Sequence, residues 1–244
     1  MSFKDYFSGH ADSYAAYRPT YPQALIDFLA DCCEHRRSAW DCATGNGQTA
    51  LALTRYFDRI VATDASAAQI DSAPPHPKIE YRVAVAETSE LPEKSIDLVT
   101  VSQALHWFDI DRFFGEAVRV LVSGGVLAAW SYGLCSVEPS ADALVLELYR
   151  NTDRYWPPER RLVEDGYRSI ELPMPAIAAP AFEMTASWRA DAMLGYLRTW
   201  SACRRYLEDR GVDPVDSIEG ALRSVWGPAS REVRWPIALK AGRA

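Results

Sequence analysis

The segment Asp41-Cys42-Ala43-Thr44-Gly45-Asn46-Gly47-Gln48 has the residue types needed to bring backbone close to a ligand. It ends a β-like run and opens a helix-like one. Gly45 and Gly47 allow a tight turn, and a helix N-terminus offers N–H groups without intrahelical partners. Residues 45–50 also fit the G-x-G-x-x-A pattern of dinucleotide-binding proteins, so the turn alone predicts a nucleotide cofactor without saying which.

Asp64 ends the next β-like run, about 20 residues beyond the glycines. A carboxylate at the end of a neighbouring strand can accept both hydroxyls of an adenosine ribose. The alternative is that Asp64 caps the following helix, since aspartate is favoured at that position. With the glycine turn upstream, we interpret Asp64 as a ribose ligand and predict an adenosine-bearing cofactor over the strand ends.

Alternating β-like and helix-like segments must position these residues. We expect a first helix over 21–33, strands over 39–43, 59–63, 79–85, 96–102 and 125–130, and helices over 48–56, 67–72 and 109–121. This alternation predicts a mainly parallel sheet covered on both faces.

The pattern changes after Gly133. We expect a helix over 140–150, an extended Pro-rich connector over 173–180, a strand over 182–188, one long helix over 190–209 and a final strand over 232–239. We interpret residues 1–244 as a single domain, with an N-terminal cap and first helix over 1–37 and an inserted lid over 134–180.

Charge and composition exclude several classes of partner. The formal net charge of −7 disfavours nucleic acid, which is usually bound by a basic field. The two-residue basic runs Arg160-Arg161 and Arg204-Arg205 are expected to be solvated faces. Without a long apolar run or a signal-peptide pattern, we expect a soluble cytoplasmic protein with no membrane partner.

The cysteines are expected to be buried, reduced thiols, because they are odd in number, scattered and set among apolar neighbours. Cys32, Cys33 and His35 lie close together, yet no second Cys/His pair at zinc spacing follows them. We therefore predict no metal site.

The chain resembles class I S-adenosylmethionine-dependent methyltransferases, specifically the small-molecule, type 11 group that includes trans-aconitate methyltransferase. The resemblance covers nearly the whole sequence, and it rests on residues 14–22, 41–48, Asp64, Ala86-Glu87 and the block 97–108, Asp-Leu-Val-Thr-Val-Ser-Gln-Ala-Leu-His-Trp-Phe. It implies an α/β fold with a Rossmann-like seven-stranded sheet, mostly parallel with the last strand antiparallel. It also implies S-adenosylmethionine as cofactor, with S-adenosylhomocysteine as product.

The resemblance implies roles for individual residues. The glycines would pass under the amino-acid part of the cofactor, Asp41 would hold its ammonium directly or through water, and Arg18 would meet its carboxylate, with Tyr14 helping the N-terminal segment to cover the site. The implied cofactor-binding set is Tyr14, Arg18, Asp41, Ala43, Gly45, Gly47, Asp64, Ala65, Ala86, Glu87 and Gln103.

Two positions depart from the family pattern. Val85 stands where many relatives have an aspartate for the adenine amino group, so Glu87 or backbone atoms are left to contact the adenine edge. Ala43 replaces the first glycine of the usual D-x-G-x-G loop, a change that is tolerable if the position needs no positive φ.

His106 lies in the block where the methyl group would emerge. It is either a general base for a hydroxyl or amine acceptor or part of the pocket wall, because a carboxylate acceptor needs no base. The lid is expected to set specificity, with Arg198 able to hold an acidic group. The predicted substrate-pocket residues are Trp107, Tyr132, Trp156, Tyr196, Arg198 and Trp200, with Trp130 a further aromatic candidate.

Other chemistries lack their motifs. No Asn- or Asp-Pro-Pro-aromatic segment, Pro-Cys nucleophile, P-loop or serine elbow is present, and no Tyr-x-x-x-Lys pair of the kind used by nicotinamide-dependent oxidoreductases follows the fourth strand. We predict methyl transfer to an oxygen of a small molecule, with a carboxylate as one candidate. The alternatives are a non-catalytic cofactor-binding protein on the same fold and an NAD(P)-dependent oxidoreductase.

Overall fold

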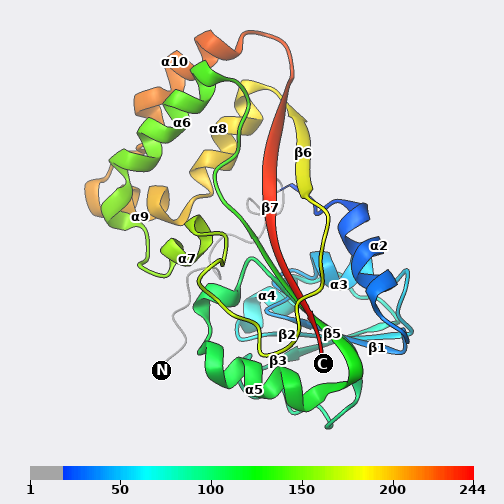
Figure 1. Ribbon diagram of the computed structural model, residues 1–244. Coiled ribbons are helices and arrows are strands. Elements are labelled where there is room, and N and C mark those ends of the chain that lie inside the picture. The colour runs from blue at the N-terminus through cyan, green and yellow to red at the C-terminus, as the bar shows by residue number, and fades with distance from the viewer. Residues whose placement is uncertain (1–18) are drawn as a thin grey trace.

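A single seven-stranded sheet organises the protein in the computed structural model, which describes residues 19–244 (Figure 1). The strand order is β3-β2-β1-β4-β5-β7-β6. The strands are β1 (Ser38–Cys42), β2 (Arg59–Asp64), β3 (Ile79–Val83), β4 (Ile96–Ser102), β5 (Leu121–Tyr132), β6 (Phe182–Trp188) and β7 (Arg231–Arg243).

The strand directions confirm the predicted fold class. β1 pairs in parallel with β2 and β4, β2 with β3, and β4 with β5. β7 alone runs against its neighbours, pairing antiparallel with both β5 and β6. The parallel strands therefore present their carboxyl ends along one edge, and the strand order reverses beside β1, where ligands of such sheets bind.

Helices cover both faces of the parallel strands. They are α2 (Gln23–Cys32), α3 (Gln48–Leu53), α4 (Ala67–Ser72) and α5 (Ile110–Val120). Trp40 of β1 packs in the core that includes Phe113 of α5, whereas its neighbour Ala39 packs in the core that includes Leu25 of α2. Successive strand residues thus enter opposite cores, as the period of a strand requires.

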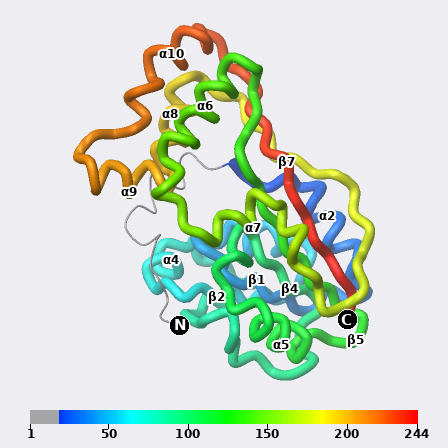
Figure 2. Tube along the Cα trace, turned by 60° about the vertical axis from the view of Figure 1, so that its left-hand side comes forward, coloured from blue at the N-terminus to red at the C-terminus, as the bar shows by residue number. Residues whose placement is uncertain are grey.

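A separate helical layer lies at one end of the molecule, beside the first half of β7 (Figure 1). It contains α6 (Pro139–Asn151), α8 (Ala190–Arg198), α9 (Ser201–Arg210) and α10 (Asp216–Trp226), which share a third core with the start of β7. The short helix α7 (Arg160–Glu164) lies between this layer and the parallel strands (Figure 2). Two 3₁₀ turns, η1 (Leu105–Trp107) and η2 (Asp153–Tyr155), complete the described elements.

The helical layer draws on two parts of the chain. The range 134–180, where we expect the lid, supplies α6, η2 and α7, whereas the segment between β6 and β7 supplies α8, α9 and α10. The sequence interpretation did not include α10.

The prediction of one helix over 190–209 is wrong, because the helix stops after Arg198 and α9 begins at Ser201. Trp200 has extended backbone angles (φ −64°, ψ 133°) and is 4% exposed. The Thr199 hydroxyl donates to the Tyr196 carbonyl at 2.6 Å, a local bond that competes with helix continuation. The break turns Trp200 into the interior.

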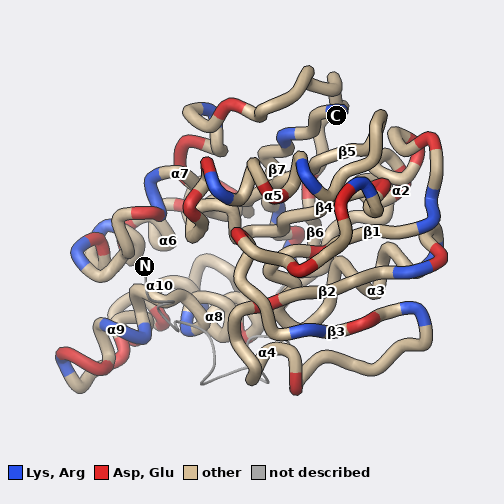
Figure 3. The backbone as a smooth tube through the Cα atoms, turned by 90° about the horizontal axis from the view of Figure 1, so that it is seen from below, with Lys and Arg blue, Asp and Glu red and all other residues tan. Residues whose placement is uncertain are grey.

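Charges of both signs are distributed over the surface, and Figure 3 shows basic and acidic residues interspersed along α9 and around β3. Within residues 19–244, no helix has the length and apolar character needed to cross a membrane. The same part of the chain contains no cluster of three or more His, Cys, Asp or Glu residues arranged to hold a metal ion.

Candidate functional site

The glycine turn after β1 uses left-handed backbone angles at three positions. Gly45 has φ 56° and Gly47 has φ 84°. A Cβ atom at Gly47 would lie 2.5 Å from the Tyr81 Oη, so this position requires glycine for space as well as for conformation. A Cβ at Gly45 would meet only Gln69 Oε1, at 3.7 Å, among the described residues.

Ala43 is the third left-handed position of the turn, with φ 54°. The condition under which alanine would be readily tolerated, that this position needs no positive φ, is therefore not met. A non-glycine residue in this region costs roughly 1–2 kcal/mol relative to an ordinary conformation. The turn therefore bears this strain at Ala43.

Asp64 lies directly against the glycine turn. Its Oδ2 accepts the Gly45 N–H at 2.9 Å, and its Oδ1 accepts the Ser66 N–H at 2.9 Å. The alternative that Asp64 caps the next helix is wrong, since Ser66 caps α4 by accepting from the Gln69 N–H.

Asp41 is fully buried beneath the turn. Its carboxylate accepts hydroxyl hydrogens from Thr44 at 2.5 Å and Thr100 at 2.7 Å. Burial raises the pKa of Asp41 to about 6, although these hydrogen bonds lower it, and the charge of Asp64 adds to the rise. The carboxyl group is thus poised to respond to a cation placed at the turn.

The loop after β3 holds the other residues expected near the adenine. Ala86 is buried, Ala65 is half-buried beside Asp64, and Val85 is 45% exposed. The Glu87 Oε1 accepts the Asp109 N–H at 2.8 Å, which ties this loop to the start of α5. Tyr14 and Arg18 lie outside the described residues.

Gln103 follows β4 and also has a left-handed conformation, with φ 55°. Its side-chain oxygen accepts the Tyr132 N–H at 2.8 Å, and its side-chain nitrogen donates to the Tyr132 carbonyl at 3.1 Å. The amide therefore extends the β4–β5 pairing by one residue. Gln103 positions the end of β5, a role that the family resemblance did not suggest.

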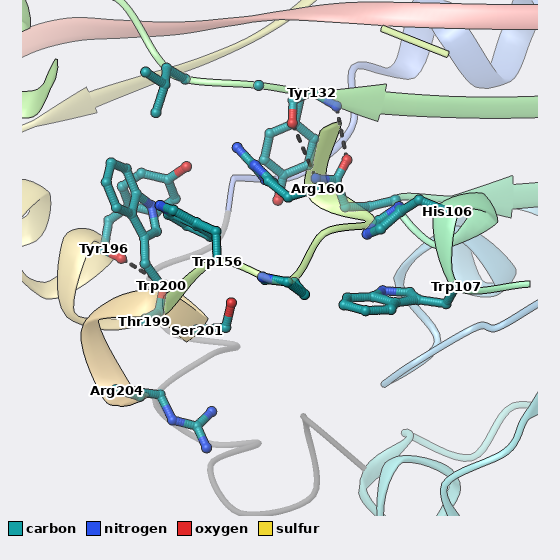
Figure 4. Close-up of a pocket in the computed structure, with 14 residues that line it drawn as sticks. His106, Trp107, Tyr132, Trp156, Arg160, Tyr196, Thr199, Trp200, Ser201 and Arg204 are labelled. Carbon is teal, nitrogen blue, oxygen red and sulfur yellow. Dashed lines mark hydrogen bonds between the residues drawn. The ribbon is translucent and has the colours of Figure 1, made fainter. Parts of the chain in front are cut away.

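A pocket opens beside Gln103, between the carboxyl ends of β4 and β5 and the helical layer. Figure 4 shows Trp156 and Trp200 from the layer on one side and His106 and Trp107 on the other. The 14 lining residues are Gln103, His106, Trp107, Tyr132, Gly133, Leu134, Trp156, Pro157, Arg160, Tyr196, Thr199, Trp200, Ser201 and Arg204. We call this the tryptophan pocket. A hydrogen bond of 3.2 Å between Thr49 Oγ1 and Ser102 Oγ links the start of α3 to the carboxyl end of β4, next to the pocket.

Five of the six predicted substrate-pocket residues line the tryptophan pocket: Trp107, Tyr132, Trp156, Tyr196 and Trp200. Arg198 does not, and the expectation that it holds a ligand's acidic group is wrong. Its guanidinium binds three carboxylates of the protein at 2.6–2.8 Å, those of Asp213, Asp216 and Glu219. Trp130 is fully buried and packs edge-on against Tyr21, with ring centroids 5.3 Å apart.

Arg160 and Arg204 line the tryptophan pocket, contrary to the expectation that both arginine pairs are solvated faces. In each pair the first residue lines the pocket, and Arg161 is exposed. Arg160 lies over the Trp156 ring at 4.8 Å. One sequence feature could have suggested a pocket position for Arg160. It lies two residues after the Trp156-Pro157-Pro158 break, beside a predicted pocket tryptophan.

His106 forms part of the pocket wall and is 7% exposed. Its Nδ1 lies 2.9 Å from the Tyr167 Oη. Burial, and secondarily the charge of Arg160, lowers the pKa of His106 to about 3. The imidazole is therefore neutral at physiological pH and is a weak proton acceptor.

Comparison with known proteins gives matches across nearly the whole chain. The family model described as "Methyltransferase domain" matches residues 40–129, which include the glycine turn and Asp64. A "Putative methyltransferase" from Dictyostelium discoideum is 33% identical over 225 residues, covering 90% of this chain and 86% of that protein.

Solved structures give the same result. A "Putative Type II Methyltransferase" from Anaeromyxobacter dehalogenans has a TM-score of 0.87 and 46% sequence identity, covering 93% of this chain and 98% of that one. A "putative methyltransferase" from Bacillus halodurans is 18% identical with a TM-score of 0.53, covering 91% of this chain and 97% of its own, and it shares the fold. These matches do not bear on the narrower similarity to trans-aconitate methyltransferase, which stays a prediction.

Proposed function

Because this chain belongs to the class I S-adenosylmethionine-dependent methyltransferases, we propose that it methylates an oxygen atom of a small molecule bound in the tryptophan pocket. Membership of this family favours a sulfonium cofactor over the nicotinamide alternative. The observation that supports the proposal most is the hydrogen bond between the Gly45 N–H and Asp64, which forms the turn after β1. The tryptophan pocket begins at Gln103, just after the neighbouring strand β4.

The residues at the turn fit S-adenosylmethionine. A Cβ at Gly45 would meet only Gln69 Oε1 among the described residues, which leaves the backbone there open to the amino-acid part of the cofactor. Asp64 holds the same turn with a carboxylate, a group that accepts hydrogen bonds of the kind that ribose hydroxyls donate. Asp41 lies beneath the same turn, where an ammonium group would favour its ionised form. When bound, this cofactor supplies a methyl group on a positively charged sulfur.

The protein's own contribution is to orient the acceptor and exclude water. A displacement at a methyl carbon depends on alignment of the attacking atom, and a closed apolar pocket favours a reaction in which opposite charges are neutralised. The aromatic walls contributed by Trp107, Trp156 and Trp200 suit that task.

Two measurements test the proposal. We expect isothermal titration to show S-adenosylhomocysteine binding at one site per chain, and a labelled-methyl assay over small acids, phenols and amines to detect turnover. Binding of NAD(P) with no binding of S-adenosylhomocysteine would contradict the cofactor assignment. Cofactor binding without turnover across the panel would favour the non-catalytic alternative.

A further inference from the structure

We propose that the methyl acceptor is a small, flat carboxylate that reacts in its ionised form and is held in the tryptophan pocket by Arg160 and Arg204. This inference rests on the proposed function, because it identifies the class of molecule that occupies the same pocket. It also assigns a binding role to two arginines that the sequence interpretation left on the surface.

The charge of the described pocket lining is one-sided. Its 14 residues include Arg160 and Arg204 but no aspartate or glutamate. Within the described part of the chain, neither arginine has a carboxylate within 4.0 Å, whereas Arg198 in the same layer has three. Arg204 Nε is buried with no hydrogen-bond partner among residues 19–244. Both arginines are half-buried, and a buried donor without an acceptor is costly, so an anionic ligand is the complement that the described pocket lining favours.

The apolar walls indicate a flat ligand body. Trp156 and Trp200 lie with ring centroids 5.6 Å apart at a tilt of 55°, and Trp107 faces them across the pocket (Figure 4). Trp156 Nε1 is buried and has no described hydrogen-bond partner, so it provides a further donor to an acceptor oxygen. Aromatic walls with donors at their edges favour a planar, unsaturated anion.

The pocket offers no effective base for a neutral hydroxyl. The His106 Nδ1 is already paired with the Tyr167 Oη at 2.9 Å, and burial lowers the pKa of the imidazole to about 3, so it accepts a proton poorly near neutral pH. The other polar side chains of the described lining are amide, hydroxyl, indole and guanidinium groups, none of which accepts a proton readily near neutral pH.

A carboxylate acceptor satisfies this constraint without any proton transfer. An oxygen of the carboxylate supplies the electron pair for the new bond to the methyl carbon, while the pair of the breaking carbon–sulfur bond stays on sulfur. The products are a neutral methyl ester and a thioether, so one negative and one positive charge are neutralised together. A hydroxyl acceptor would instead require removal of a proton by a base.

Binding of benzoate and cinnamate to the full chain saturated with S-adenosylhomocysteine tests the assignment, with benzamide, cinnamyl alcohol and benzylamine as matched probes. We expect the carboxylates to bind and to quench tryptophan fluorescence, and the amide, alcohol and amine to bind at least about 10-fold more weakly. The variants Arg160→Gln and Arg204→Gln are each expected to weaken carboxylate binding by about 10- to 100-fold. Their affinity for S-adenosylhomocysteine is expected to stay at the wild-type value.

Three controls separate anion binding from folding. Arg150→Gln, an exposed arginine of α6, is expected to change neither affinity. Arg160→Lys and Arg204→Lys keep the charge and are expected to recover part of the carboxylate affinity lost in the glutamine variants. With a turned-over carboxylate and saturating S-adenosylmethionine, kcat/KM for the acceptor is expected to be flat from pH 7 to 8, since neither the acceptor nor His106 titrates there and Asp41 is ionised above its pKa of about 6.

Each failure has its own meaning. Equal affinity for benzoate and benzamide, or unchanged carboxylate affinity in both arginine variants, would overturn the inference while leaving the proposed function intact. Binding of S-adenosylhomocysteine with no affinity for either carboxylate would overturn it as well. If the wild-type chain does not bind S-adenosylhomocysteine, the proposed function is contradicted. Carboxylate binding can then still be measured on the cofactor-free chain, so the two failures remain distinguishable.

Discussion

Gly45 and Asp64 belong to the loops after neighbouring parallel strands, and a 2.9 Å hydrogen bond from the Gly45 N–H to Asp64 Oδ2 joins them. Parallel pairing of β1 with β2 brings the two strand ends to the same edge of the sheet. One carboxylate therefore fixes the conformation of the turn and faces the place where ribose hydroxyls are expected. The turn and the acid form one structural unit.

Substitution Asp64→Ala is expected to reduce the affinity for S-adenosylhomocysteine at least about 100-fold, because bonds from hydroxyls to a charged acceptor contribute roughly 1.5–3 kcal/mol each. Isothermal titration measures the loss, and circular dichroism checks the fold. Asp71→Ala, at an exposed position of α4, is the matched control and is expected to bind normally. Unchanged affinity in Asp64→Ala would show that the cofactor does not lie at this turn.

Substitution Ala43→Gly is expected to leave stability unchanged or raise it by up to about 1 kcal/mol, because relief of the left-handed alanine offsets the added freedom of the unfolded chain. Ala68→Gly, at an exposed position of helix α4, is expected to destabilise by about 0.5–1 kcal/mol. Urea unfolding of both variants gives the comparison. A similar loss in the two proteins would mean that Ala43 is not strained.

The sequence was sufficient to predict the sheet and the glycine turn that lies beside Asp64. Parallel strands buried on both faces leave strong apolar runs, and glycine is nearly required where the backbone adopts positive φ, so both features are visible in local patterns. Ala43 is the exception, since it adopts a positive φ without being glycine. An alanine in a strained conformation looks the same in the sequence as one in an ordinary conformation.

The lining of the tryptophan pocket was predictable only in part. The aromatic residues were identified by type, yet which arginine lines the pocket depends on where α7 and α9 begin. The break at Thr199 sets the phase of α9 and so the direction of Arg204. Arg198 and Arg204 are both arginines of the helical layer, and only packing distinguishes the ion-paired residue from the pocket residue.

Substitution Gln103→Glu is expected to destabilise the protein by about 1–3 kcal/mol at pH 7, because an ionised carboxylate cannot donate to the Tyr132 carbonyl and would lie against it. Protonation restores a donor, so the stability difference from wild type is expected to shrink as the pH falls towards 4. Urea unfolding between pH 4 and 7 measures this trend. A difference independent of pH would assign the loss to packing alone.

The contribution of Asp41 to folding stability is expected to change with pH in the opposite direction from that of an ion-paired surface carboxylate. Its pKa is about 6 in the folded chain and near 4 in the unfolded chain, so the folded state binds the proton more tightly. Stability linked to this group is fully present below about pH 4 and is lost as the pH rises through 6, by roughly 3 kcal/mol at most. The variant Asp41→Asn lacks this loss, so its stability relative to wild type is expected to rise from pH 4.5 to pH 7.

Binding of S-adenosylhomocysteine tests whether Asp41 also serves the ligand. A cofactor ammonium at the turn would favour the ionised carboxylate, so affinity is expected to rise up to about tenfold per pH unit from pH 5 towards 6 and to level off above it. Asp41→Asn is expected to bind more weakly at pH 7 and to show a much flatter profile, because it removes the titrating group. His106, with its pKa lowered to about 3, contributes no slope in this range. Identical pH profiles in wild type and variant would confine Asp41 to its hydrogen bonds with Thr44 and Thr100, and would place the ammonium elsewhere.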